Sequence, residues 1–124
     1  MTVRFAFVRQ TKFIMAKSTQ ANNGNNYRYV FARDKPLFPA GRTVATPGAL
    51  TLLDHAGINA SALLARHQRG DFGDIDEADR IANANAIRHH ARILSAYVLG
   101  SGIRIWIITE ADRSATTLLL PEEY

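Results

Sequence analysis

Two polar clusters in this chain carry side chains of the kind that acid–base chemistry needs. One cluster is RHQRGDFGD, residues 66–74, and it includes His67, whose side chain titrates near neutral pH when its pKa is unperturbed. The other is TEADRSATT, residues 109–117, and it includes Glu110 and Arg113. RNA can be cleaved without a metal by a base that removes the 2′-hydroxyl proton, an acid that protonates the leaving oxygen and an arginine that stabilises the charged phosphorane. The two clusters therefore suggest a ribonuclease site, if the fold brings them into one cleft.

Each side chain has a definite role in this hypothesis. His67 and Glu110 would be the acid–base pair, while Arg92 and Arg113 would bind phosphate. The side chains that would position the substrate are Ser95, Asp112, Ser114 and Thr116. The alternative is structural: residues 110–114 form an ordinary turn held by side-chain bonds to the backbone, and His67 is a satisfied histidine on a helix face. The two clusters are far apart in the sequence, so both interpretations stay open.

The chain lacks the motifs of several other chemistries. It has no cysteine, which excludes disulfides, thiolate metal sites and cysteine nucleophiles. It has no Gly-Lys-Ser/Thr phosphate loop, no HExxH zinc motif and no G-x-S-x-G nucleophile elbow. His89 and His90 are adjacent, so they point in different directions on a helix and do not chelate one metal in the usual way. We therefore expect neither a cofactor nor a bound metal.

Charge is distributed unevenly along the chain. Residues 1–42 hold eight basic residues and one acid, whereas residues 43–124 hold seven basic residues and ten acids. A basic segment joined to a mildly acidic body favours contact with a polyanion such as RNA or DNA. The alternative is a solubilising arm that binds no partner.

Residues 1–36 also contain two short alternating stretches, residues 3–9 and 27–33, around an Asn/Gly-rich loop. They predict a basic, aromatic β-hairpin or a partly disordered arm. Aromatic faces beside arginines are surfaces on which single-stranded nucleic acid stacks. The residues predicted to bind it are Arg4, Arg9, Tyr27, Arg28, Tyr29, Phe31 and Arg33. Alternatively, these aromatic side chains pack on the core, or Met15 is the natural start and residues 1–14 are an extension.

The pattern of residues 37–124 predicts a single α+β domain with two or three helices. Thr46 before Pro47 has the pattern of an N-cap and a first-turn proline, and Gly57 has that of a helix stop. A second helix is expected from Asn59 to Arg69.

A third helix is expected over about residues 75–90. Asp74 and Glu77 have capping-box spacing at its start. Acids at this end and basic residues at the other complement the helix dipole, which accounts for the acidic run without a metal.

Three strands are expected after the helices, over residues 92–99, 103–110 and 115–120. Short polar turns separate them, so they would form an antiparallel β-meander packed against the helices. A short strand at residues 42–45 and strands from the N-terminal segment would extend the sheet.

Four stretches give the chain a resemblance to a known group of proteins. They are LFPAGRTVATPGAL, LLARHQRGDFGDIDEAD, RILSAYVL and IWIITEADRSATTLLLPEEY, all between residues 37 and 124. The chain resembles small proteins encoded on bacterial plasmids and integrated elements, often labelled type I restriction endonuclease subunit M. The resemblance implies an origin on a mobile element and assigns no catalytic residue. In organisation, a helix-borne histidine followed by an antiparallel sheet is similar to small barnase- and RelE-like ribonucleases.

These observations lead to two functional hypotheses. In the first, the chain is a nucleic-acid-directed protein of a plasmid, phage or other mobile genetic element, and in its most specific form a metal-independent ribonuclease. In the second, it is a non-enzymatic binding protein, such as an anti-restriction or anti-CRISPR factor, that holds a host or element protein. No stretch approaches the roughly 20 apolar residues of a membrane span, and residues 1–14 lack the pattern of a secretory signal, so a cytoplasmic protein is expected.

Overall fold

The computed structural model describes residues 6–7 and 35–124 of the chain. The nucleic-acid-binding residues predicted between Arg4 and Arg33 therefore lie outside the described residues. In the part of the chain that is described, no helix combines the length and the apolar composition that crossing a membrane requires.

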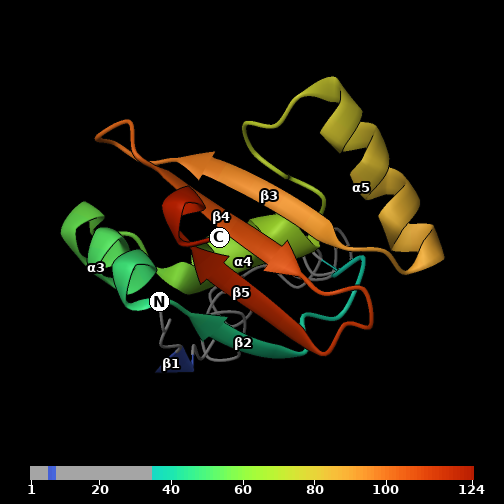
Figure 1. Cartoon of the computed structure of the whole chain (residues 1–124), viewed down its shortest axis with the longest axis horizontal. Helices are drawn as coiled ribbons and strands as arrows, with labels where there is room; N and C mark the ends of the chain where they lie inside the picture. The colour runs from blue at the N-terminus through green and yellow to red at the C-terminus, as the bar shows by residue number, and fades with distance from the viewer. Residues whose placement is uncertain (1–5, 8–34) are drawn as a thin grey trace, which may run out of the picture.

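A mixed β-sheet forms the centre of the molecule (Figure 1). Its strands, in the spatial order β1-β2-β5-β4-β3, are β1 (Ala6–Phe7), β2 (Arg42–Ala45), β5 (Ala115–Leu119), β4 (Arg104–Thr109) and β3 (Ile93–Val98). β2 and β5 pair in parallel, and the other neighbouring strands pair antiparallel. The predicted C-terminal meander is confirmed as β3, β4 and β5, and the fold class as α+β.

In the described part of the chain, three helices, α3 (Pro47–Ala56), α4 (Ala60–Gln68) and α5 (Glu77–His89), pack around the sheet. Residues next to the helix ends account for where α3 and α4 begin and where α3 ends. The Thr46 hydroxyl accepts a hydrogen bond from the third amide of α3 at 3.1 Å, and Asn59 Oδ1 accepts one from the second amide of α4 at 2.9 Å. Gly57 ends α3 in the left-handed conformation, with a φ of 67°.

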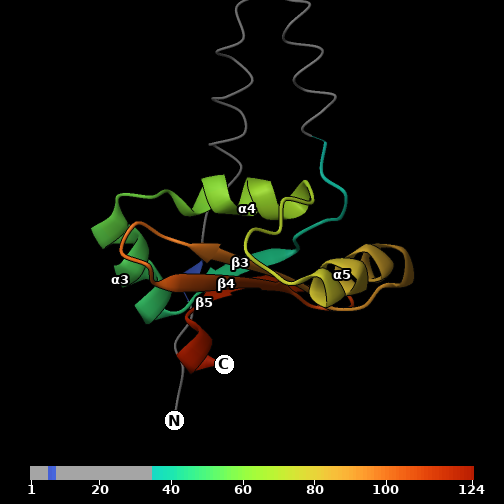
Figure 2. The same cartoon turned by 90° about the horizontal axis from the view of Figure 1, so that it is seen from above.

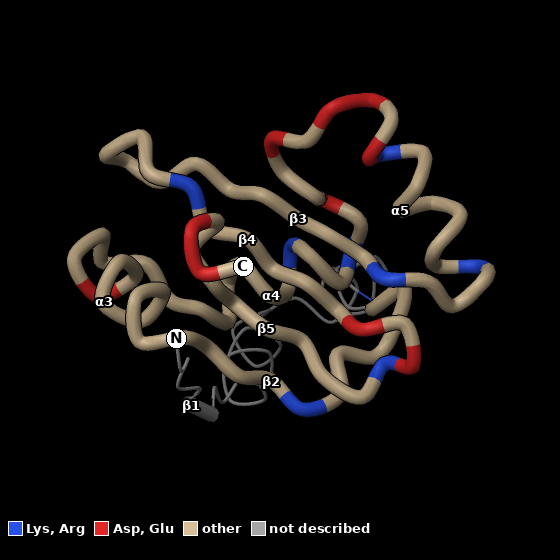
Figure 3. The backbone as a smooth tube through the Cα atoms, in the orientation of Figure 1, with Lys and Arg blue, Asp and Glu red and all other residues tan. Residues whose placement is uncertain are grey.

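α5 begins two residues later than the capping pattern predicts. Its N-cap is Asp76, whose carboxylate accepts a hydrogen bond from the Asp79 amide at 2.8 Å. Asp74, the predicted cap, instead forms an ion pair with Arg104 of β4 at 2.8 Å. Figure 3 shows the acidic residues gathered around the start of α5, where negative charge stabilises the positive end of the helix dipole.

The main core lies between α4 and one face of the sheet. In Figure 2, α4 crosses one face, while the C-terminal 3-10 helix η1 (Pro121–Glu123) lies on the other side. The large apolar side chains of the main cluster are Leu53, Leu63, Leu64, Tyr97, Leu99, Ile105, Ile107 and Leu118. A smaller cluster consists of Phe38, Phe72, Ala86 and Ile93. Removing these side chains from water is the main favourable term in folding.

The β3 edge of the sheet is shielded by α5 and the loop before it (Figure 1). The side-chain amide of Asn83 donates to the Leu94 carbonyl at 2.7 Å and accepts from the Leu94 amide at 3.1 Å, as a neighbouring strand would. Further along the same strand, Ala96 donates to the Phe72 carbonyl at 3.0 Å and accepts from the Asp74 amide at 2.7 Å. These contacts occupy backbone groups that could otherwise pair with another chain.

Residue 73 lies close to β3, so a substitution there tests whether the contact between the loop before α5 and the edge of β3 stabilises the fold. Gly73 has a φ of 76°, and a Cβ added to it would lie 2.2 Å from the Ala96 carbonyl oxygen. Gly73→Ala should lower the free energy of unfolding by about 3 kcal/mol or more, because both the backbone conformation and the contact oppose a side chain. In the matched control, Gly57→Ala, φ is 67° but nothing lies within 4 Å of the added Cβ, so only conformational strain applies. That strain costs about 1 kcal/mol. Urea denaturation measures the free energy of unfolding of both variants. An equal decrease for the two would contradict a close contact between residue 73 and the Ala96 carbonyl.

Candidate functional site

His67 is the centre of a buried hydrogen-bond network. The residue lies on α4, and 0% of its surface is exposed. Its Nδ1 lies 2.6 Å from Ser95 Oγ, and its Nε2 lies 2.8 Å from Thr109 Oγ1. Phe38 and Phe72 meet the imidazole ring edge-on. Both ring nitrogens therefore have partners, and the ring is enclosed by the core.

The network continues across the sheet to the segment before β2. Thr109 Oγ1 lies 2.7 Å from Thr116 Oγ1, and the Thr116 hydroxyl donates to the Ala40 carbonyl at 2.7 Å. Thr109 and Thr116 are register partners on β4 and β5, so their side chains share the face that α4 covers. One line of hydrogen bonds thus joins α4 to three strands and to residue 40.

The contacts along this line determine that Nε2 of His67 carries a proton. A carbonyl oxygen can only accept, so the Thr116 hydroxyl must donate its proton to Ala40. The Thr109 hydroxyl must then donate to Thr116, and His67 Nε2 must donate to Thr109. Nδ1 of the neutral ring is left to accept the proton of the Ser95 hydroxyl. A neutral histidine protonated on Nε2 satisfies all four contacts.

Burial also opposes a positive charge on this side chain. Loss of hydration lowers the pKa of His67 from 6.5 to about 3. A general acid or base works best when its pKa lies near the operating pH and it reaches the substrate. His67 meets neither condition, so its surroundings favour a structural role.

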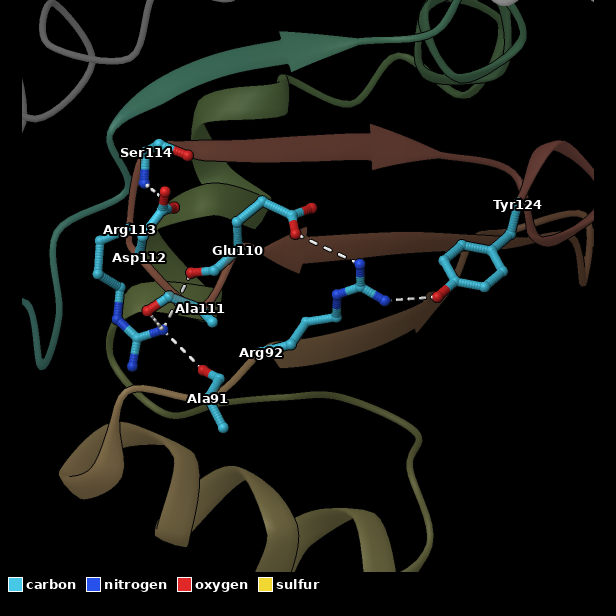
Figure 4. A network of polar contacts seen from close by, with 8 residues as sticks. All are labelled: Ala91, Arg92, Glu110, Ala111, Asp112, Arg113, Ser114 and Tyr124. Carbon is cyan, nitrogen blue, oxygen red and sulfur yellow. Dashed lines mark hydrogen bonds and ion pairs between the residues drawn. The ribbon is translucent and has the colours of Figure 1, made fainter.

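Arg113 is buried beside the C-terminal end of α5, with 9% of its surface exposed. Its guanidinium donates to the Ala86 and Ala91 carbonyls, each at 2.7 Å. It also donates to the carbonyls of Glu110 at 3.1 Å and Ala111 at 3.3 Å (Figure 4). A cation at this position stabilises the negative end of the helix dipole. The guanidinium is therefore directed into the protein and not toward a phosphate.

Glu110 and Arg92 lie on the other face of the sheet. Glu110 follows Thr109 along the chain, and successive side chains of a strand point to opposite faces. Arg92 Nη2 lies 3.3 Å from Glu110 Oε1, and Arg92 Nη1 donates to the hydroxyl of Tyr124 (Figure 4). The two paired side chains are 51% and 41% exposed, so this ion pair contributes little to stability.

Asp112 and Ser114 hold the turn between β4 and β5. The Ser114 amide donates to Asp112 Oδ1 at 2.9 Å (Figure 4). Hydrogen bonds from the Ser114 hydroxyl and amide lower the pKa of Asp112 below its usual value. Arg113, between them, has a φ of 62°, in the left-handed region. This is the side-chain-supported turn of the structural interpretation.

The structure brings part of the predicted site together and separates the rest. His67 meets the hydroxyl groups of the sheet, but it does so inside the core. The Glu110–Arg92 pair lies on the opposite face, and Arg113 closes the end of α5. The predicted acid, base and phosphate ligands thus do not line one cleft in this geometry.

The acidic run before and within α5 is accounted for by capping and by the ion pair with Arg104. Within residues 6–7 and 35–124, no three His, Cys, Asp or Glu side chains are grouped so that they could hold a metal ion.

An aromatic cluster on the sheet face opposite α4 was not among the predicted site residues. Strand register places Trp106 between Ala96 on β3 and Leu119 on β5. Tyr124 packs against Trp106, with ring centroids 5.8 Å apart and ring planes at 67°. The Arg92 guanidinium lies 5.9 Å from the centre of the Tyr124 ring. We call the surface formed by these five residues the Trp106 face.

Comparison of the chain with models of known protein families, with curated proteins and with solved structures gives no match.

The buried neutral histidine makes the fold sensitive to acid. The unfolded chain binds a proton at His67 with a pKa near 6.5, whereas the folded chain binds it only near a pKa of about 3. Protons therefore favour the unfolded state as the pH falls below 6.5, and this continues down to about 3. Between these two pH values, protonation of His67 should lower the free energy of unfolding by up to about 1.4 kcal/mol for each unit by which the pH falls.

Urea denaturation of the wild type and of His67→Leu over this range measures the effect. The carboxylates are the same in both proteins, so the difference between the two pH profiles isolates the histidine. His67→Leu should be less stable at neutral pH, because Ser95 and Thr109 lose a buried partner. Its stability should nevertheless fall less steeply toward low pH. Parallel profiles would contradict the burial of a neutral imidazole.

Arg113→Lys tests the carbonyl contacts at the end of α5. A lysine ammonium cannot reach the Ala86 and Ala91 carbonyls together, so the free energy of unfolding should fall by about 2–4 kcal/mol. Amide hydrogens of α5 should exchange faster in this variant. Arg88→Lys, at an exposed position on the same helix, should change stability by less than about 0.5 kcal/mol. If Arg113→Lys lowers the free energy of unfolding no more than Arg88→Lys does, the carbonyl contacts of Arg113 do not contribute to stability.

Proposed function

We propose that this chain binds nucleic acid without cleaving it. The observation that carries the proposal is the excess of basic over acidic residues, eight against one, in residues 1–42. Lysine and arginine side chains neutralise phosphates and release counterions, which supplies affinity that does not depend on sequence. Residues 35–124 are nearly balanced, with nine basic and ten acidic side chains. The positive charge that would attract a polyanion therefore belongs to residues 1–34.

The surroundings of two candidate residues support binding over cleavage. His67 is enclosed, with both ring nitrogens hydrogen-bonded, and Arg113 donates to backbone carbonyls. The ribonuclease hypothesis thereby loses one member of its acid–base pair and one of its two phosphate ligands. A non-enzymatic protein needs neither group to be open to solvent.

Fluorescence anisotropy and gel analysis with labelled single-stranded RNA in EDTA test this function. We expect binding that weakens with salt while the RNA stays intact. Replacing both Arg28 and Arg33 with glutamine should weaken binding and lower the slope of log K against log salt by about 1.4, since each phosphate contact to a single strand contributes about 0.7. Replacing Arg80 and Arg88 of α5 in the same way is the control, and it should leave the slope nearly unchanged.

Two results would overturn the proposal. Absence of binding to any nucleic acid at low salt would point to a protein partner, the alternative hypothesis. Cleavage of the RNA would contradict binding without cleavage, and its loss in a His67→Ala variant that thermal unfolding shows to be folded would restore the ribonuclease hypothesis.

A further inference from the structure

The Trp106 face presents two aromatic rings at one place on the sheet. Trp106 is half-buried in β4, and Tyr124 is 70% exposed. Their planes meet at 67°, so the two rings form a corner above the small side chain of Ala96 and the buried Leu119. A flat ligand that stacks on the open side of the tyrosine ring would have the indole beside it.

The segment that carries Tyr124 is anchored before any ligand arrives. The Glu123 carboxylate accepts hydrogen bonds from the Thr46 hydroxyl and from the Leu120 amide. Arg92 holds the Tyr124 hydroxyl at the other end of the ring (Figure 4). A ring that is fixed in advance loses little conformational freedom on binding, so more of the stacking energy appears as affinity.

Two arginines lie on either side of these rings on the same face. The backbone of Arg104 is two residues before Trp106 on β4, about 7 Å away along the strand, and the backbone of Arg92 lies opposite Glu110, about 13 Å beyond Trp106. The Arg92 guanidinium extends back toward Tyr124 and lies 5.9 Å from the centre of its ring. Arg104 pairs with Asp74 at 2.8 Å and Arg92 with Glu110 at 3.3 Å, and all four side chains are substantially exposed. Because exposed ion pairs are weak, a phosphate can replace either carboxylate at low cost.

Given the proposed function, on which this step rests, we propose that the Trp106 face binds single-stranded nucleic acid. A base stacks on the Tyr124 ring with its edge toward Trp106, and the phosphates on either side contact Arg92 and Arg104. Unpaired bases expose the flat faces that such a corner needs, whereas a duplex keeps them stacked inside. Stacking accepts any base, so the face has little sequence preference. The basic residues of the N-terminal third supply long-range attraction, and this face supplies the short-range contact.

Trp106 is the one tryptophan of the chain, so its fluorescence reports on this face directly. The experiment titrates the full-length protein with oligouridylate and with an RNA duplex of the same length. Oligouridylate should quench the indole emission in step with binding followed by anisotropy. The duplex should bind through charge alone and leave the emission nearly unchanged.

Two substitutions test the contacts, and a matched variant controls for charge. Tyr124→Leu keeps an apolar side chain but removes the stacking ring, and Arg92→Gln removes one phosphate contact. Each should weaken binding of oligouridylate, the first by about tenfold or more. Arg80→Gln is the control for Arg92→Gln, because Arg80 is 50% exposed and paired with Glu77, just as Arg92 is 51% exposed and paired with Glu110. Thermal unfolding shows whether each variant is folded.

The outcomes separate this inference from the function on which it rests. Oligouridylate could bind without quenching the indole and bind Tyr124→Leu and Arg92→Gln as tightly as the wild type. This result would place the binding site elsewhere and leave the nucleic-acid function intact. No binding of either RNA would overturn both. Quenching by polyglutamate as strong as that by oligouridylate would assign the face to acidic polypeptides instead.

Discussion

The line of hydrogen bonds through His67 is the constraint on which the arrangement of the domain depends. It links α4, β3, β4, β5 and the segment before β2, and each contact uses one proton in one direction. Because the groups are buried, loss of any member leaves its neighbour without a partner, which costs more than the bond itself contributes. The line also specifies strand register: a shift of one residue in β4 or β5 would turn Thr109 or Thr116 to the wrong face.

The two faces of the sheet differ because this line of hydrogen bonds lies on one of them. The face toward α4 is closed, and its polar side chains are satisfied by one another. The opposite face retains half-exposed charged pairs and the aromatic corner formed by Trp106 and Tyr124. Residue type alone is therefore a poor guide to function here. His67 and Arg113 look suited to catalysis but make their hydrogen bonds inside the protein, whereas Arg92 lies on the opposite face beside Tyr124.

The sequence predicts those parts of the domain that depend on near neighbours. Thr46, Asn59 and Gly57 act within one helical turn, so two helices are placed correctly, and the alternation of the last three strands yields the meander. Contacts across long separations are not predictable in this way. His67 and Thr109 are 42 residues apart, and nothing local indicates that they meet. The choice of Asp76 over Asp74 as helix cap depends likewise on a distant residue, Arg104. Trp106 and Tyr124 were overlooked because their pairing depends on how η1 folds back over the sheet.

The attachment of α5 has a consequence for how this protein can change over evolutionary time. The helix has 13 residues, yet only Asn83 and Ala86 are buried. The Asn83 amide binds β3, Arg113 donates to the Ala86 carbonyl, and Ala86 and Ile87 pack in the smaller core cluster. The exposed positions of the helix are thus free of packing demands, and substitutions there are tolerated as long as these contacts persist. The helix can drift in sequence, or acquire a new surface for recognition, without disturbing the sheet. Among the described elements, it is the natural place for relatives of this chain to diverge.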